Sequence, residues 1–128
     1  DVQLVVMVKR AIQELNPSLR LKKIDVHGCS DEELLVINKE HLNHDYYTDI
    51  ITFDYSRGDR MSGELFISLD RVKDNAQALG VTYSSELRRV VAHGILHLTG
   101  LKDKTEEEIK VMRHKEDEVL AYLENYGS

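Results

Sequence analysis

Residues 90–98 constrain the fold of this chain more than any other stretch, because they are apolar on nearly every side of a helix. Such a helix is typically buried inside a domain. The stretch also carries His93 and His97, and side chains four residues apart lie on one face of a helix. A buried imidazole needs a polar partner, since an unsatisfied buried polar group costs about 1–3 kcal/mol. The pattern therefore predicts a central, buried helix with a polar role on one face.

A shared metal ion would satisfy both imidazoles, and the residues that follow supply a third donor. Gly100 permits the left-handed turn that ends a helix, and Asp103 can then return a carboxylate to the two histidines. Two histidines at this spacing, with no other signal, are more often ordinary core or surface residues. Here the apolar setting, the glycine and the carboxylate together favour a metal site. Nitrogen donors with one oxygen donor suit Zn²⁺, and three protein ligands leave a fourth position open, as in catalytic sites. We predict one zinc ion per chain, bound by His93, His97 and Asp103; another divalent metal would fit the same donors.

Three segments of the chain match motifs of one protein family, and they occur in the same order as in that family. Residues 93–103 match the pattern His-Gly-x-Leu-His-Leu-x-Gly-Tyr-Asp-His, with Asp103 at its third histidine. Residues 38–53 are similar to an Asn…Pro-Thr-Asp-Val-Leu-Ser-Phe segment, and residues 63–68 are similar to a Gly-Asp-Ile strand. Together these segments resemble the YbeY family of bacterial metal-dependent endoribonucleases. The family's arginine, which is thought to contact the RNA phosphate, falls at Leu42 in this alignment.

The resemblance implies a zinc-dependent, single-strand-specific endoribonuclease of the bacterial cytoplasm. Its expected partners are ribosomal RNA and the small ribosomal subunit, in maturation of the 3′ end of the small-subunit rRNA and in ribosome quality control. The residues alone indicate only a zinc hydrolase, and they leave open whether water or the ribose 2′-hydroxyl attacks. Two alternatives are a zinc metallopeptidase-like hydrolase and a non-catalytic ribosome-assembly factor with a structural metal. Gly94 disfavours the peptidase, because His-Glu-x-x-His peptidases carry their general base at that position.

Other polar residues are candidates for supporting roles. Cations that could contact RNA phosphate are Arg57, Arg60, Lys102 and Lys104, although each alone is more often a solvated surface charge. Asp49 and Glu64 could hold the free ring N–H groups of the metal histidines or act as a base. A second polar group, His41, His44 and Asp45, is better explained as a hydrated loop than as another metal site.

The remaining pattern predicts a single α+β domain over residues 1–128, in which a small mixed sheet of about four strands packs with helices. We expect helices over residues 2–15, 30–41, 68–80, 84–99 and from 105 onward, a strand over 19–27 and an antiparallel hairpin over 49–68. The resemblance also implies a strand before the first helix, and we expect this chain to keep little of it. The net charge of −6 argues against broad attraction to nucleic acid, although a local basic cleft could still bind RNA. No stretch is apolar enough to span a membrane.

Overall fold

The computed structural model describes residues 2–42 and 48–126, which form five helices and three strands. The elements in chain order are α1 (Val2–Leu15), β1 (Arg20–Cys29), α2 (Asp31–Leu42), β2 (Ile50–Asp54), β3 (Arg60–Ser68), α3 (Leu69–Leu79), α4 (Tyr83–Leu98) and α5 (Glu106–Tyr126). Each element lies where the sequence predicts it, to within a few residues. His44 and Asp45 of the second polar group lie outside the described residues.

The three strands form one mixed sheet in the order β1-β3-β2. β2 and β3 pair antiparallel as the predicted hairpin, whereas β1 runs parallel to β3 with a register shift between Leu21 and Ile24. The α+β class and the mixed sheet are thus confirmed. The described residues contain three strands, one fewer than the expected number of about four.

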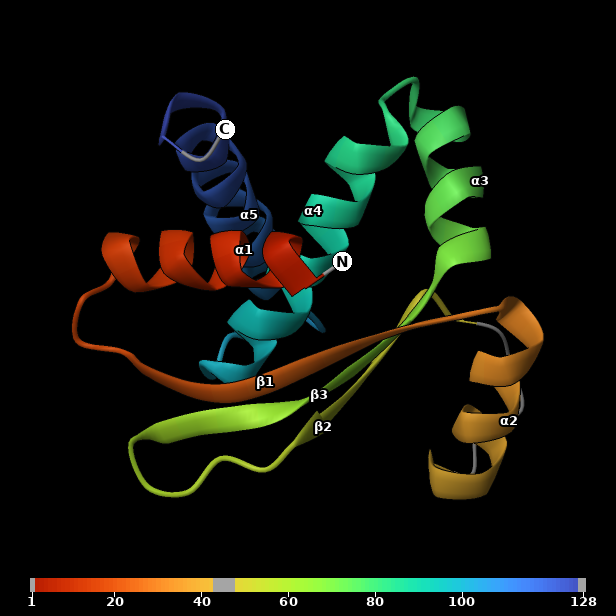
Figure 1. Ribbon diagram of the computed structural model, residues 1–128, viewed down its shortest axis with the longest axis horizontal. Coiled ribbons are helices and arrows are strands. Elements are labelled where there is room, and N and C mark those ends of the chain that lie inside the picture. Colours follow the sequence, from red (N-terminus) through yellow and green to blue (C-terminus); the bar gives the residue numbers. More distant parts are fainter. Residues whose placement is uncertain (1, 43–47, 127–128) are drawn as a thin grey trace.

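The two faces of the sheet have different coverings, and this separates the side chains of β3. Helices α1, α3, α4 and α5 gather on one side of the sheet (Figure 1). Leu65 and Ile67 of β3 are fully buried on that side, within the main core. Glu64 and Phe66 alternate with them and therefore point to the other side, which α2 partly covers. Any side chain that serves a site on α4 must accordingly come from the Leu65 side of the sheet.

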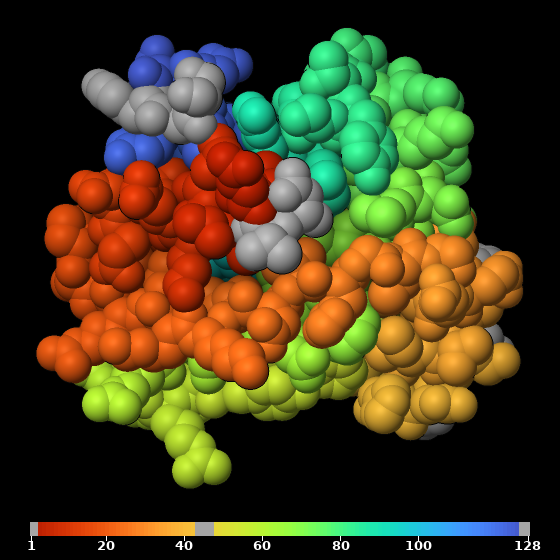
Figure 2. Space-filling view, viewed as in Figure 1, coloured from red at the N-terminus to blue at the C-terminus, as the bar shows by residue number. Residues whose placement is uncertain are grey.

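Helix α4 is the centre of the domain, because it contacts α1, α3, α5, β2 and β3. In the space-filling view, α1 and β1 extend across the middle of the visible face and leave little of the C-terminal half of α4 in sight (Figure 2). Gly94 allows this close packing, since a Cβ at that position would lie 2.7 Å from Leu65 Cδ1 and 2.8 Å from Ile50 Cδ1. The glycine therefore brings α4 down onto the sheet.

Local hydrogen bonds explain why the helices begin and end where they do. Ser30 and Glu33 form a capping box at the start of α2, in which each side chain accepts from the other residue's backbone amide, at 3.1 and 2.8 Å. The box of Thr105 and Glu108 opens α5 in the same way. Gly80 ends α3 with a φ of +70°.

Among the described residues, no helix combines the length and apolar character that crossing a membrane requires.

Candidate metal centre

The three predicted ligands lie around one cavity at the C-terminal end of α4. His93 Nε2 lies 3.1 Å from Asp103 Oδ2, and the ring centroids of His93 and His97 are 6.0 Å apart. All three side chains line a cavity of about 280 Å³, here called the loop-side cavity. The other described residues that line it are Asn38, Leu42 and residues 48–52. His93 is half-buried and His97, in the last turn of α4, is exposed, so only the first histidine has the buried setting that the sequence suggests.

The orientation of His97 is fixed by a backbone carbonyl. Its Nδ1 lies 2.6 Å from the carbonyl oxygen of Leu101, in the loop that follows α4. A carbonyl oxygen only accepts, so Nδ1 carries the hydrogen and the neutral ring keeps a free lone pair on Nε2. Metal-binding histidines are commonly held in this way, with one ring nitrogen on an acceptor and the other available for the metal.

His93 is held by a carboxylate from another helix. Its Nδ1 lies 2.7 Å from Glu116 Oε2 of α5, while its Nε2 faces Asp103. Two carboxylates thus face the two nitrogens of one imidazole. The hydrogen bond to Glu116 is the main cause of a raised pKa for His93, and the charges of Glu116, Asp103 and Asp49 act in the same direction against the opposing effect of burial. Each ring nitrogen therefore faces a carboxylate oxygen, and a metal cation could take the place of a proton on Nε2.

Glu116 is itself part of a buried ion-pair network. Only 5% of this residue is exposed, and its second oxygen accepts from Arg89 Nη1 at 2.9 Å. Arg89 also donates to Asp117 Oδ1 at 2.8 Å, at the surface. The network joins α4 to α5 and fixes the carboxylate that orients His93.

Replacing Glu116 with alanine is expected to cost about 3 kcal/mol of unfolding free energy, because it leaves Arg89 and His93 without their buried partner. Urea denaturation of the two proteins measures the change. Asp117→Ala is the matched control: its side chain is 57% exposed, so its loss should cost less than about 1 kcal/mol. Equal losses in the two variants would contradict a buried network.

The three side chains carry the nitrogen and oxygen donors that zinc binds, and the distance between two of these donors also suits a shared metal ion. Two ligands bound tetrahedrally at about 2.0–2.1 Å from zinc are separated by about 3.3 Å, close to the 3.1 Å between His93 Nε2 and Asp103 Oδ2. Across residues 2–42 and 48–126, however, no three His, Cys, Asp or Glu side chains lie close enough together to hold an ion without adjustment. The third donor would have to approach, and His97 is the exposed member of the set.

A larger cavity lies on the other side of His93, between α3, α4 and α5. This helix-side cavity has a volume of about 550 Å³ and shares Asp49, Ile50, His93 and Asp103 with the loop-side cavity. Glu86 of α4 also lines it, although only 7% of this residue is exposed. Burial is the main cause of a raised pKa for Glu86. The sequence analysis missed Glu86, Arg89 and Glu116.

Glu86→Gln is expected to make unfolding less dependent on pH. A carboxyl group whose pKa is raised on folding holds its proton longer in the native state, so its contribution to stability falls as the pH rises from about 4.5 through the raised pKa. The melting temperature of the glutamine variant, relative to that of the wild type, should therefore increase over this interval and then level off. Thermal melts recorded between pH 4 and 8 measure the difference; a constant or decreasing difference would contradict it.

The structure brings one of the two supporting carboxylates to the site. Asp49 lines both cavities, and its carbonyl accepts from the Ser68 amide at 2.9 Å. Glu64 points to the opposite face of the sheet, where its carboxylate contacts His27 at 3.0 Å and the Tyr55 hydroxyl at 2.9 Å. Its position follows from the alternation of side chains along β3.

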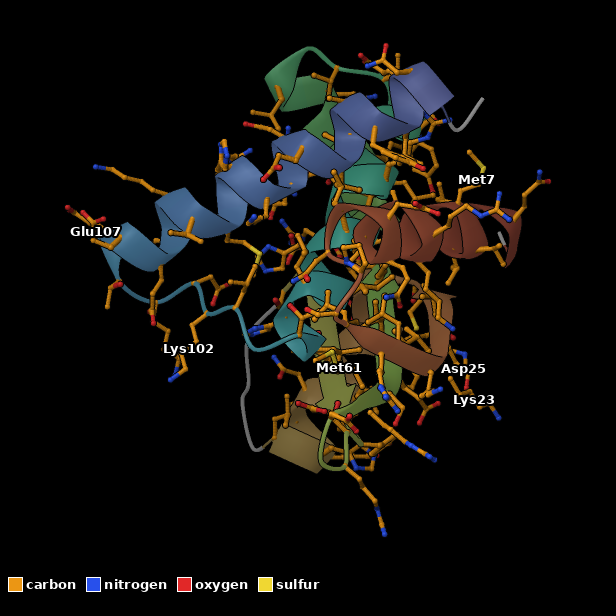
Figure 3. The ribbon with its side chains drawn as sticks, turned by 90° about the vertical axis from the view of Figure 1, so that its left-hand side faces the viewer. Met7, Lys23, Asp25, Met61, Lys102 and Glu107 are labelled. Carbon is orange, nitrogen blue, oxygen red and sulfur yellow. The ribbon has the colours of Figure 1, made fainter. Side chains whose placement is uncertain are left out.

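The four predicted phosphate contacts lie in two places. Arg57 and Arg60 pair with each other through their backbones at the hairpin turn, and the described lining of the two cavities contains neither of them. Lys102 and Lys104 are exposed on either side of Asp103. The loop with Lys102 leads from α4 to the start of α5, where Glu107 extends outward (Figure 3). Of the four predicted cations, the two lysines are therefore the ones adjacent in sequence to a candidate ligand, Asp103.

Comparison with known proteins gives one consistent result. A family model described as "Endoribonuclease YbeY" matches residues 2–124. A curated protein named endoribonuclease YbeY from Bacteroides thetaiotaomicron is 54% identical over 102 residues, which cover 80% of this chain and 74% of that protein. The protein of the same name from Parabacteroides distasonis is 45% identical, over 96% of this chain and 91% of the other. The solution structure of TM1509 from Thermotoga maritima has the same fold, with a TM-score of 0.64 at 24% identity over 98% of this chain and 87% of its own.

Proposed function

Because this chain belongs to the YbeY family of endoribonucleases, we propose that it cuts single-stranded RNA with a zinc ion bound by His93, His97 and Asp103. The protein is an enzyme of a metal-dependent family, and its substrate is RNA. The proposal includes a role in maturation of the small-subunit rRNA 3′ end and in ribosome quality control, in the cytoplasm, with the small ribosomal subunit as partner. The observation that carries it is the pair of oriented imidazoles, each with Nδ1 on an oxygen acceptor.

The charges around the site indicate why RNA chemistry here needs a cation. The described lining of the helix-side cavity contains four carboxylates, Asp49, Glu86, Asp103 and Glu116, against two guanidinium groups, Arg89 and Arg113. An RNA phosphate would be repelled by this lining alone. A zinc ion held by the three ligands would supply a Lewis acid next to the phosphate and lower the pKa of a water molecule.

The residues of the chain have distinct parts in this proposal. Glu116 and the Leu101 carbonyl each hold the Nδ1 atom of one histidine, which leaves the two Nε2 atoms for the proposed metal. Asp49 lines both cavities and is proposed to accept a proton from the attacking hydroxyl or water. Lys102 and Lys104 flank Asp103 and are proposed to contact the phosphate backbone.

The structure disfavours the peptidase alternative at one residue. The position of the peptidase base is Gly94, which is packed against Leu65 and Ile50 of the sheet. A glutamate there would have to enter the core rather than face a substrate. The phosphodiester reaction relies more on charge stabilisation and does not require a base at that position.

The proposal is tested by incubating the purified protein with a labelled single-stranded RNA, the same RNA in a duplex, and casein. We expect cleavage of the single strand, little cleavage of the duplex and none of casein. A chelator should stop cleavage, and added zinc should restore it. Casein cleavage with intact RNA would favour the peptidase, and zinc binding without cleavage of either substrate would favour the assembly factor.

A further inference from the structure

The helix-side cavity has the dimensions of a ligand site and an apolar wall. Its volume of about 550 Å³ lies within the range of about 300–1,000 Å³ that small-ligand pockets occupy. Ile50, Leu79, Ile109 and Met112 supply apolar surface from β2, α3 and α5. Leu79 is 62% exposed and Ile109 is 48% exposed. A flat ring could therefore cover apolar side-chain surface that water now contacts.

Among the described lining residues, Glu86 is the carboxylate of this cavity that has no role in the candidate metal centre. Only 7% of Glu86 is exposed, and it lines this cavity. Its carboxylate oxygens are not among the fully buried atoms of the described residues that lack a partner, so they open onto the cavity. A ligand that fills the cavity covers this carboxylate, and removing it from water is costly unless the ligand supplies N–H donors. The charge of Arg89 attracts this carboxylate, but the hydrogen bonds of its guanidinium go to Glu116 and Asp117.

We propose that the helix-side cavity binds one unpaired guanine base of the RNA, with the Glu86 carboxylate accepting hydrogen bonds from N1–H and N2–H of the base. This inference rests on the proposed function, since the base is part of the RNA whose phosphate reaches the metal centre. His93 and Asp103 line the same cavity, so a base held there adjoins the reacting phosphate.

Guanine fits this lining better than the other bases. It alone carries two adjacent N–H donors on its Watson–Crick edge, which match the two oxygens of one carboxylate. Its O6 needs a donor beside them, and the Arg113 guanidinium lines the same cavity. Adenine and cytosine would each place a ring-nitrogen acceptor against the carboxylate, and uracil would offer a single N–H.

The test is binding of fluorescent 2′-O-methyl pentanucleotides, measured by anisotropy with the metal-loaded protein. Each has four uracils and a central guanine, inosine or adenine, and a gel confirms that it stays intact. The wild type should bind the guanine pentamer about tenfold or more tightly than the adenine pentamer, because one buried charged partner would otherwise be unsatisfied. Inosine, which lacks the N2 amine, should fall between them.

Glu86→Gln should reduce the guanine-to-adenine ratio to less than about twofold, since the amide offers one acceptor and one donor in place of two acceptors. Glu14→Gln, an exposed position on α1, removes the same charge and should leave the ratio unchanged. Thermal melts confirm that both variants fold.

The outcomes separate this inference from the proposed function. Equal binding of the three pentamers to the wild type would overturn the guanine site, whether or not the protein cuts RNA. A guanine preference that persists in Glu86→Gln would also overturn it, because another group would then read the base. A preference that disappears in the variant supports the site even if no RNA is cut, in which case only the proposed activity fails.

Discussion

Replacing His93 with alanine is expected to reduce RNA cleavage about a thousandfold or more. His93 contacts both Asp103, at 3.1 Å, and Glu116, at 2.7 Å, so its loss removes one proposed ligand and releases the partner of another. Charge stabilisation by a bound metal is worth several kcal/mol in the transition state, and each 1.36 kcal/mol corresponds to about tenfold in rate. Initial rates on a single-stranded RNA at saturating zinc measure the effect.

His114→Ala is the matched control for this experiment. His114 lies on the exposed face of α5, with a side-chain exposure of 74%, and it pairs with Glu118 at 3.5 Å. Its removal should leave the cleavage rate within about twofold of the wild type. A His93→Ala protein that folds and retains more than a tenth of the wild-type rate would remove His93 from the proposed machinery.

Gly63→Ala is expected to destabilise the protein by about 3 kcal/mol or more. A Cβ at this position of β3 would lie 2.4 Å from the backbone carbonyl oxygen of Phe53, in the neighbouring strand β2, and 2.9 Å from Leu98 Cδ2. Overpacking a well-filled interior typically costs about 1–3 kcal/mol, and a clash with backbone is harder to relieve than a clash with a side chain. Urea denaturation at an unchanged m-value measures the loss.

Gly94→Ala provides the comparison, because the atoms that its Cβ would meet are the side-chain ends of Leu65 and Ile50. These ends can shift, and alanine is favoured over glycine in a helix by about 1 kcal/mol. We therefore expect a clearly smaller loss than for Gly63→Ala. If the two variants were equally stable, or Gly63→Ala lost less than about 1 kcal/mol, β2 and β3 would not approach as closely as the structure indicates.

The order and limits of the secondary structure could be predicted because their signals are local. Ser30 with Glu33, Thr105 with Glu108, and Gly80 mark helix ends through contacts within a few residues. The parallel pairing of β1 with β3 has no such signal, since it joins strands that are separated by a helix and another strand. Pairings of this kind depend on the packing of the whole domain.

The candidate site shows the same division between local and distant contacts. His93, His97 and Asp103 could be predicted from one eleven-residue stretch. Arg89 and Glu86, four and seven residues before His93, share its helical face and could have been found by the same spacing. Glu116 could not, because it lies 23 residues later on another helix and reaches His93 only when α5 packs against α4. The alternation of side chains between the two faces of β3 could have predicted that Glu64 points away from the site.

The most direct test of the account is the metal content of the wild type and of Asp103→Ala, measured by elemental analysis, with RNA cleavage assayed on the same samples. Asp103 is the proposed ligand at which this chain departs from the three-histidine motif, and its Oδ2 lies 3.1 Å from His93 Nε2. The account predicts about one zinc per wild-type chain, and loss of both zinc and cleavage in the variant. An Asp103→Ala protein that keeps its zinc and its cleavage rate would contradict the proposed ligand set.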